Sequence, residues 1–326
     1  MVGIAIETQT HFMADSYIQM SDEFYKSLPK EEGWSKPIYK YKRYWYPGNY
    51  LPSVISFQQQ FQAEDTDIFV VTIPKSGTVW LKALTYAIVN RARYTPSSNS
   101  HPLLTTNAHS LVPFMEAQLY LHNKNPDLSK LESPRLFGTH IPYSSLPESI
   151  KDSKCRIVYL CRNPKDVIVS FWYFLQKFGA KVEFDQAFEL FCKGALPFGP
   201  YWEHVLEFWK LSLELPQKVL FLKYEDMKED SNLHLKKMAE FLGYPFSSQE
   251  VDEGVVDDIL KLCSFQNMST LEVNKSGRAD FDGKFANDIF FRKGKVGDWR
   301  DHLTQEMVEK LEEITKEKLD GSGLML

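Results

Sequence analysis

The chain has 326 residues and carries 38 Lys and Arg against 43 Asp and Glu. Its formal net charge of −5 excludes a protein held on nucleic acid by bulk electrostatics, but a few cations can still converge on a small anion. Its hydrophobic content of 43%, with 16 Gly and 17 Pro, excludes wholesale disorder and collagen-like or low-complexity classes.

The segment before residue 66 is predicted to be an irregular N-terminal extension that packs on the main domain. Residues 39–48, YKYKRYWYPG, mix aromatic side chains with cations and end in a turn. No Gly/Ser-rich linker and no repeat of fixed period separates this segment from the rest. Length alone would allow two domains, but α/β chains of this size often form one. We therefore expect one structural domain, with the extension at 1–65 and the main part at 66–326.

From residue 68 onward, strand-like runs alternate with helical patterns. Apolar runs predict strands over 68–73, 135–139, 156–161 and 219–224. Apolar residues at helical spacing occur over 81–88, 167–175, 233–242 and 307–314. Pro164 suits a first helical position and Thr304 suits an N-cap. The alternation predicts an α/β fold, in which helices flank a central parallel sheet whose strands are buried on both faces.

The cysteines and the hydropathy pattern indicate the compartment. The four cysteines are Cys155, Cys161, Cys192 and Cys263. They have no C-x-x-C spacing and no histidine at ligand spacing, so we expect free thiols and no zinc site. The first residues offer no secretory signal, and no stretch approaches the ~20 apolar residues of a membrane span. These features predict a cytoplasmic protein with no membrane partner.

The segment 72–81, TIPKSGTVWL, is the most informative in the chain. A buried strand runs into a tight turn, and a helix follows at once, so the first helical N–H groups and the helix dipole favour an anion. Lys75, Ser76 and Thr78 add donors, and Gly77 lets the backbone approach closely. An ordinary capped turn is the alternative. The segment is not the G-x-x-x-x-G-K-[ST] phosphate loop, which occurs nowhere in the chain.

Two further segments repeat this chemistry. The strand at 156–161 leads into Arg162, a bidentate oxyanion donor, and then into a helix that contains Ser170. The segment 291–299, FRKGKVGDW, places three cations within four residues beside two glycines. Each could instead be a solvated turn paired with nearby acids. Because ligands of parallel α/β sheets collect at the carboxyl ends of the strands, the segments together predict a ligand with two anionic groups.

These segments resemble those of the cytosolic sulfotransferases, and the match runs from about Pro52 to His302. Residues 72–81 are similar to the family's 5′-phosphosulfate loop, 159–174 to its 3′-phosphate strand-turn-helix, and 292–299 to its Arg-Lys-Gly-x-x-Gly-Asp-Trp loop. The resemblance implies a single α/β domain related to the nucleotide kinases. It also implies 3′-phosphoadenosine 5′-phosphosulfate (PAPS) as the sulfuryl donor and 3′,5′-bisphosphoadenosine as the product.

The resemblance assigns expected roles residue by residue. The donor-binding positions are Lys75, Ser76, Gly77, Thr78 and Val79 at the phosphosulfate, Arg162, Ser170, Arg292, Lys293 and Gly294 at the 3′-phosphate, and Trp80, Tyr224, Cys263 and Phe265 around the adenine. Cys263 stands where animal relatives usually have Thr. No metal is expected, because no carboxylate cluster in the sequence is typical of a magnesium site.

His140 is the expected general base. An acceptor hydroxyl must lose its proton as it attacks the sulfuryl group, and histidine is the usual base near neutral pH. Thr139–Pro142 matches the family's Thr-His-x-Pro motif, whose His is the base. Gly138 stands where animal members usually carry Lys, so the charge on the transferring group is expected to rest more heavily on Lys75.

The acceptor is specified only as a class. The aromatic residues at 44–50, together with Phe174, could line an apolar pocket or simply pack in the core. The similarity to plant enzymes suggests a small hydroxylated lipophile, namely a steroid, brassinosteroid, flavonoid or other phenol. Gln305 replaces the apolar residue of a dimerisation stretch found in animal relatives, so a monomer is expected. A nucleotide or nucleoside kinase, and a non-catalytic carrier of small lipophiles, remain as alternatives.

Overall fold

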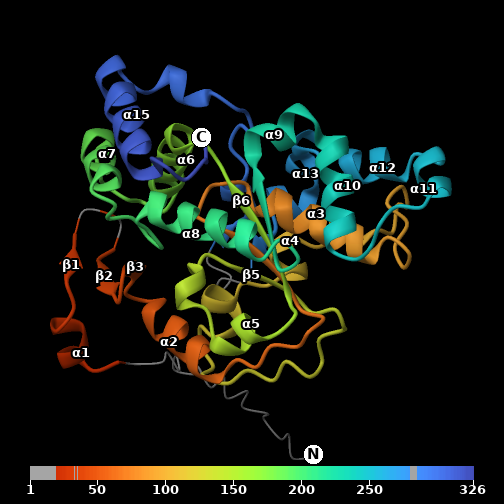
Figure 1. The fold of residues 1–326 in the computed structure, drawn as a ribbon, viewed down its shortest axis with the longest axis horizontal. Helices are drawn as coiled ribbons and strands as arrows, with labels where there is room; N and C mark the ends of the chain where they lie inside the picture. The colour runs from red at the N-terminus through yellow and green to blue at the C-terminus, as the bar shows by residue number, and fades with distance from the viewer. Residues whose placement is uncertain (1–19, 33, 35, 280–284) are drawn as a thin grey trace, which may run out of the picture.

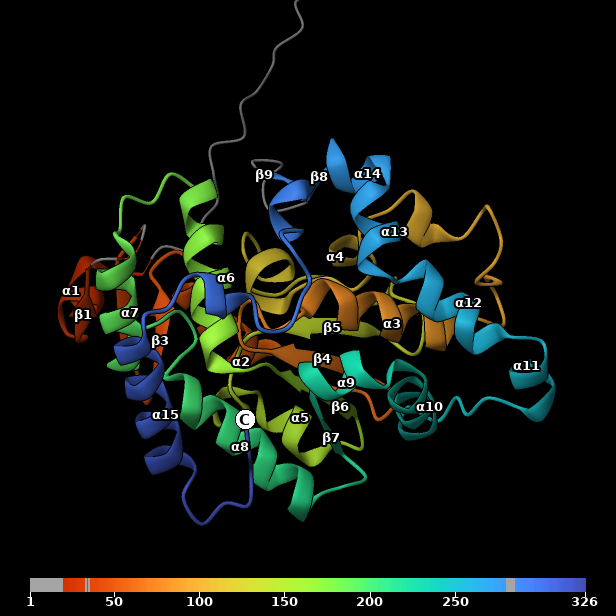
Figure 2. The same cartoon turned by 90° about the horizontal axis from the view of Figure 1, so that it is seen from above.

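A four-stranded parallel sheet lies at the centre of the molecule, and helices cover both of its faces (Figures 1 and 2). The structure, a computed structural model, describes residues 20–32, 34, 36–279 and 285–326. In chain order its strands, α-helices and short non-α helices (η) are α1 (Asp22–Lys26), β1 (Lys30–Glu31), β2 (Ile38–Tyr41), β3 (Tyr44–Pro47), α2 (Leu51–Gln60), β4 (Ile68–Thr72), α3 (Thr78–Asn90), η1 (Pro102–Leu104), α4 (Ala108–Leu111), η2 (Met115–Leu119), β5 (Leu136–Thr139), η3 (Tyr143–Ser145), α5 (Glu148–Asp152), β6 (Arg156–Cys161), α6 (Pro164–Lys177), α7 (Phe184–Cys192), α8 (Tyr201–Glu214), β7 (Val219–Lys223), α9 (Tyr224–Glu229), α10 (Ser231–Phe241), α11 (Ser248–Asp252), α12 (Val255–Leu262), α13 (Phe265–Thr270), α14 (Glu272–Lys275), β8 (Arg278–Ala279), β9 (Phe285–Ala286), η4 (Asn287–Phe290), η5 (Asp298–Asp301) and α15 (Gln305–Leu319).

The order of the strands in the sheet indicates where a ligand can bind. The strands lie in the order β5-β4-β6-β7, and all three pairings are parallel. The chain goes from β4 to one side for β5 and then to the other side for β6, so the connections diverge at the carboxyl end of β4. Such a switch point is where open α/β sheets bind ligands. The turns after β4 and β6 are the two anion-binding turns that the sequence predicts.

The sheet separates two hydrophobic cores, because successive side chains of a strand point to opposite faces. Phe69 and Val71 of β4 face one core, which also contains residues of α2, α6, α7, α8 and α15. Ile68 and Val70 face the other, which contains residues of α3, α4, α10 and α12. All five residues of β4 are buried. The prediction of an α/β fold with strands covered on both faces is confirmed.

The predicted strands and helices are found, with small shifts at their ends. Tyr224, predicted as the last residue of a strand, instead begins α9 directly after β7. Pro164 occupies the first turn of α6, whose N-cap Asn163 accepts a hydrogen bond from the Lys165 amide. Thr304 caps α15 through the Met307 amide. Within the described residues, no helix is long and apolar enough to cross a membrane.

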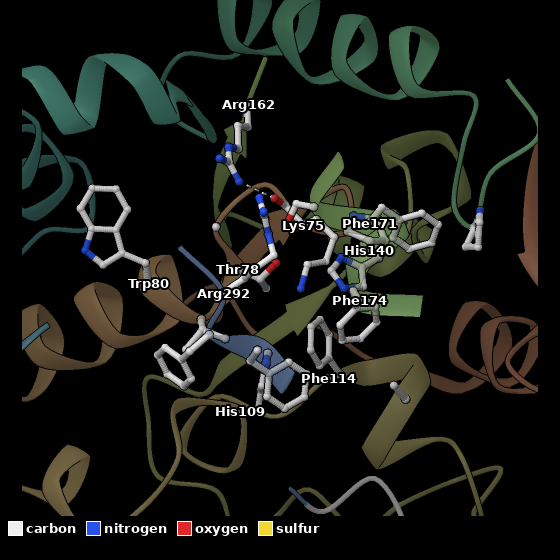
Figure 3. A pocket seen from close by; sticks show the side chains of 18 of the residues that line it. Lys75, Thr78, Trp80, His109, Phe114, His140, Arg162, Phe171, Phe174 and Arg292 are labelled. Atoms are coloured by element: carbon white, nitrogen blue, oxygen red, sulfur yellow. Dashed lines mark hydrogen bonds between the residues drawn. The ribbon is translucent and has the colours of Figure 1, made fainter. Parts of the chain in front are cut away.

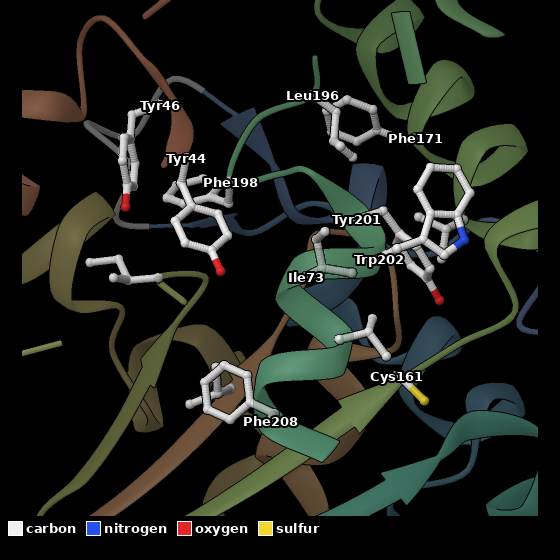
Figure 4. Packing of buried hydrophobic residues seen from close by; sticks show 14 of the residues in the cluster. Tyr44, Tyr46, Ile73, Cys161, Phe171, Leu196, Phe198, Tyr201, Trp202 and Phe208 are labelled. Atoms are coloured by element: carbon white, nitrogen blue, oxygen red, sulfur yellow. The ribbon is translucent and has the colours of Figure 1, made fainter. Parts of the chain in front are cut away.

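The N-terminal segment is more regular than predicted. Residues 1–19 lie outside the described residues, but from residue 20 the segment forms α1, a three-stranded antiparallel sheet and α2. Tyr44 and Tyr46 alternate inward along β3 and are buried beside Phe198 (Figure 4). The Trp45 amide donates a hydrogen bond to the Gly199 carbonyl, and the Trp45 carbonyl accepts one from the Phe198 amide. The sequence could not reveal this alternation of inward and outward residues, because Tyr44, Trp45 and Tyr46 are all aromatic, whichever way they point.

Candidate functional site

The carboxyl edge of the sheet opens into one cavity of about 670 Å³ (Figure 3). It brings together residues that are far apart in sequence. The predicted site residues that line it are Lys75, Gly77, Thr78, Val79, Trp80, His140, Arg162, Ser170, Tyr224, Cys263, Phe265, Arg292, Lys293 and Gly294. The one remaining predicted residue, Ser76, is fully buried and does not reach the cavity wall.

The turn between β4 and α3 is built to receive an anion. Gly77 is the N-cap of α3 at φ 107°, a conformation that favours glycine, and it has no side chain to cap the helix. A Cβ at this position would lie 2.9 Å from the Tyr224 ring. The Oγ of Ser76 is buried without a hydrogen-bond partner among the described residues. The first N–H groups of α3 therefore remain as donors for a ligand.

Lys75 is the cation of this turn. Its backbone is also left-handed, at φ 72°, which is uncommon for a residue with a side chain. Its ammonium lies 4.0 Å from the centroid of the Phe174 ring. Burial, and next the charges of Arg162 and Arg292, lower the pKa of Lys75 to about 7. The amine, which lies in the cavity wall beside two guanidinium groups, is thus in an electropositive place where an anion would restore its proton.

Arg162 follows β6 and is held from several sides. Its guanidinium donates to the Lys295 carbonyl at 2.7 Å, lies 3.4 Å from the Asp166 carboxylate, and stacks 4.7 Å from the centre of the Tyr224 ring. The same Asp166 accepts the amides of Gly297 and Trp299. The pairing of Arg162 with Asp166, the alternative raised by the sequence, is therefore present. Asp166 therefore connects the turn after β6 to the C-terminal loop at 291–299.

The C-terminal loop carries Arg292 and Lys293 to the same cavity. Both pair with Asp298, at 2.5 and 2.6 Å, so a carboxylate of the loop orients both cations. Gly294, at φ 60°, lies directly against the Phe265 ring, where a Cβ would clash. The sequence did not identify Asp298 as the residue that holds the two cations. Its position in the Gly-Asp-Trp triplet was the available signal.

One side of the cavity fits a molecule with two anionic groups. The Nε atoms of Arg162 and Arg292, which both line the cavity, are buried without partners among the described residues. Buried polar groups are rarely left unpaired unless a ligand or water completes them. Beside them, Trp80 and Tyr224 meet edge to face at 5.4 Å and offer an aromatic surface. No group of three or more His, Cys, Asp and Glu side chains in the described part of the chain could hold a metal ion.

His140 stands at the end of β5 with its tautomer fixed. Its Nδ1 lies 2.7 Å from the Thr72 carbonyl oxygen, which can only accept a hydrogen bond, so Nδ1 carries the proton and Nε2 presents a lone pair. The His140 amide donates to Glu116, and its carbonyl accepts from the Nε2 of His204. Burial lowers the pKa of His140 to about 3, so the resting ring is neutral. The site therefore presents a proton acceptor held by its backbone and its ring.

The comparisons with known proteins agree with this geometry. Residues 65–323 match the family model described as "Sulfotransferase domain". The chain belongs to the sulfotransferase family. Cytosolic sulfotransferase 5 of Arabidopsis thaliana is 48% identical over 304 residues, which cover 91% of this chain and 94% of that protein.

Solved sulfotransferase structures share the fold. A crystal structure of a candidate steroid sulphotransferase of Arabidopsis thaliana is 41% identical, with a TM-score of 0.76 over 93% of this chain and 94% of that one. The structure of mouse sulfotransferase SULT7A1 complexed with PAP is 26% identical, with a TM-score of 0.69 over 87% of this chain and 95% of that one. The enzyme class, a sulfotransferase, follows from the family, and the kinase and carrier alternatives are set aside.

The rest of the sulfotransferase cavity is walled by apolar and aromatic side chains. The walls include Trp34, Ile38, Phe114, Phe171, Phe174, Leu175, Phe178 and Phe198. Both alternatives left open by the sequence for the aromatic residues at 44–50 and Phe174 are found. Tyr44 and Tyr46 pack in the core, whereas Tyr50 and Phe174 reach the cavity. The inward alternation of β3 explains the difference.

Lys82 of α3 was not among the predicted site residues of the sulfotransferase. Its side chain is fully buried, and its Nζ lies 2.5 Å from the place where a Cβ on Gly138 would stand. The missing side chain of Gly138 therefore makes room for a lysine from the neighbouring helix. Lys82 is not among the residues that line the cavity, whereas Lys75 is. A lysine on the same helix face as the buried Thr78 and Thr85 was the signal available in the sequence.

Proposed function

We propose that this sulfotransferase transfers the sulfuryl group of PAPS to a hydroxyl of a small lipophilic acceptor. The turn at Lys75–Val79 would hold the 5′-phosphosulfate, and Arg162, Ser170 and the loop Arg292–Gly294 would hold the 3′-phosphate. The adenine would lie among Trp80, Tyr224, Cys263 and Phe265. The unpartnered Nε atoms of Arg162 and Arg292 support this assignment, and so does the PAP-containing structure of the mouse relative.

The observation that carries the mechanism is the bond between His140 Nδ1 and the Thr72 carbonyl. It directs the lone pair of Nε2 to the acceptor hydroxyl. As the acceptor oxygen bonds to sulfur, the bond from sulfur to the 5′-phosphate oxygen breaks, and the hydroxyl proton passes to Nε2. Lys75 would balance the charge on the transferring group and on the departing phosphate. No metal takes part in this proposal.

The acceptor class follows from the walls of the cavity. Aromatic and aliphatic side chains surround the approach to His140, which suits a steroid, brassinosteroid, flavonoid or other phenol. The Arabidopsis structure described as a candidate steroid sulphotransferase supports this class. We also propose a cytoplasmic location, supported by the names of the curated relatives, with no nucleic-acid or membrane partner.

Replacing His140 tests this mechanism. His140→Ala should lower kcat by about 10²- to 10⁴-fold, the usual contribution of a positioned general base. The affinity for 3′,5′-bisphosphoadenosine, measured by calorimetry, should stay within about twofold, because the donor is held by the turns and loop. The loss should be smaller for an acidic phenol than for an aliphatic steroid alcohol. His234→Ala on α10 is the matched control, and we expect it to keep normal turnover.

Retention of a tenth or more of the kcat on the aliphatic alcohol would show that His140 is not the base. A parallel loss of bisphosphate affinity would show instead that the variant disturbs the donor site.

A further inference from the structure

Both backbone polar groups of His140 bond to buried side chains of other elements. Its amide donates to Oε1 of Glu116 at 2.8 Å, and its carbonyl oxygen accepts from Nε2 of His204 at 3.0 Å. Its ring bonds to the Thr72 carbonyl oxygen at 2.7 Å. Three elements therefore hold this one residue, which directly follows β5: η2 through Glu116, α8 through His204, and β4 through Thr72. The proposed sulfuryl transfer gives Glu116 and His204 no role.

The Glu116 carboxylate takes the place of a neighbouring strand at the edge of the sheet. β5 is an edge strand, and its Gly138 amide donates outward to the Pro113 carbonyl at 2.8 Å. The His140 amide is two residues further on and points to the same side, but there the chain has turned into η2. Glu116 of η2 accepts this amide with Oε1 and the Thr139 hydroxyl with Oε2, each at 2.8 Å. Both oxygens of a wholly buried carboxylate thus bond to the end of β5 and the residue after it.

His204 holds the carbonyl side of His140, and its own tautomer is fixed. A carbonyl oxygen can only accept, so the His204 Nε2 that bonds to it carries a hydrogen. Burial lowers the pKa of His204 to about 4, so the ring is neutral around pH 7 and its Nδ1 has a lone pair. That lone pair accepts from the Tyr159 hydroxyl of β6 at 2.9 Å. Tyr159 therefore orients the ring that holds the His140 carbonyl.

The aim of a base depends on its backbone as well as on its ring. Thr72 holds Nδ1 of His140, but the ring can turn about this one bond if the peptide units on either side of His140 shift. A displacement of about 1 Å at a catalytic group can cost about 10²-fold in rate. Burial raises the pKa of Glu116, so a charged carboxylate is costly at this place. A hold on the backbone of the base gives this costly group a use.

We propose that Glu116 and His204 are positioning residues, which hold the backbone of His140 so that its ring keeps Nδ1 on Thr72 and Nε2 toward the acceptor. This inference rests on the proposed function, because the base is the group whose lone pair must be aimed. Glu116 also lies in the cavity wall, so its effect through His140 must be separated from a direct effect on the acceptor.

Nuclear magnetic resonance tests this hold without turnover. The full-length protein, free of ligand, is labelled with ¹⁵N in its eight histidines, and the signals of His140 are those that His140→Ala lacks. In the wild type they should report the Nδ1–H tautomer alone. Glu116→Met and His204→Phe each remove one backbone bond, so each should move the two ring-nitrogen shifts toward each other as the Nε2–H form appears. Glu116→Gln keeps an oxygen for the His140 amide and should stay close to the wild type.

Turnover of 4-nitrophenol with PAPS tests whether the hold acts through the base. Glu116→Met and His204→Phe should each lower kcat about 10- to 100-fold, while the affinity for 3′,5′-bisphosphoadenosine stays within about twofold. Neither should lower kcat further in a His140→Ala background, because a positioning residue acts only through the residue that it holds. A direct effect of Glu116 on the acceptor, or a general loss of structure, would persist in that background.

Asp67→Asn is the matched control. Asp67 is an equally buried carboxylate that bonds to Arg135 and lies directly before β4, at the opposite end of the strand from Thr72. This variant should lower the free energy of unfolding but leave the His140 signals and kcat unchanged. If Glu116→Met does not fold, His204→Phe decides, because it keeps a ring among Tyr44, Tyr159 and Phe208.

His140 signals that do not move in the folded variants would overturn the proposal. It would also be overturned by a loss of kcat that is undiminished in the His140→Ala background, or by a Glu116→Gln variant as impaired as Glu116→Met. Normal kcat in His140→Ala would contradict the proposed function instead, and the His140 signals would still report whether Glu116 and His204 hold the ring.

Discussion

Lys75 should take up a proton when 3′,5′-bisphosphoadenosine binds. Burial and the charges of Arg162 and Arg292 lower the pKa of its ammonium to about 7 in the free protein, from an ordinary value of 10.5. A bound nucleotide would bring phosphate charge among these three cations, which favours the protonated form and raises that pKa. Binding therefore takes up a proton at any pH between the free and the bound values.

The size of the effect follows from the free value. With a pKa of about 7, roughly nine-tenths of Lys75 is neutral at pH 8 and roughly a tenth at pH 6, so uptake should be about 0.9 and 0.1 proton. The dissociation constant should correspondingly rise by up to about tenfold for each pH unit above 7. Phosphate monoesters have a second pKa near 6, so measurements at pH 8 and 9 exclude their own titration.

Calorimetric titrations in buffers of different ionisation enthalpy measure the uptake directly. Lys75→Arg is the matched control, because arginine keeps the positive charge but stays protonated throughout this range. It should show no uptake and an affinity that is nearly constant from pH 7 to 9. Uptake near zero in the wild type at pH 8, or equal uptake in Lys75→Arg, would refute this account of Lys75.

Two other expectations follow from particular contacts. Gly138→Ala would place a Cβ 2.5 Å from Nζ of Lys82 and should cost about 1–3 kcal/mol in the free energy of unfolding measured with urea. That cost should fall sharply in a Lys82→Ala background, and strict additivity of the two changes would contradict it. The protein should also sediment as a monomer at micromolar concentration, because Gln305 is exposed and bonds to Glu309 within its own helix. A dimer that is lost on changing Gln305 would contradict this.

The sheet and the donor residues could be predicted because their signals are local. A strand buried on both faces is a continuous apolar run, as at 68–72. Lys75 and Arg162 follow such strands directly, so the parallel order of the sheet brings them to one edge. The roles of these residues remain proposals, but their convergence on one cavity follows from topology alone.

The contact between Lys82 and His109 could not be predicted in the same way. The two residues are 27 positions apart and belong to different helices, and the Lys82 side chain occupies the space that Gly138 leaves without a Cβ. No periodicity or motif in the sequence reveals this space beside Gly138, because it depends on how α3 packs on β5. The same holds for Asp166, whose carboxylate joins two segments 131 residues apart.

Burial acts on Lys75 and His140 in the same direction but with opposite consequences for catalysis. It lowers the pKa of His140, the proposed base, to about 3, so this ring is unprotonated at any physiological pH. It lowers the pKa of Lys75 to about 7, so around neutral pH this cation is only partly formed before an anion arrives. The bound donor would then raise the positive charge on Lys75, and the proposed sulfuryl transfer requires that charge. An acceptor that enters an empty cavity meets an unprotonated His140 but a Lys75 that is only partly charged. In the proposed mechanism, this difference favours productive geometry after the donor has bound.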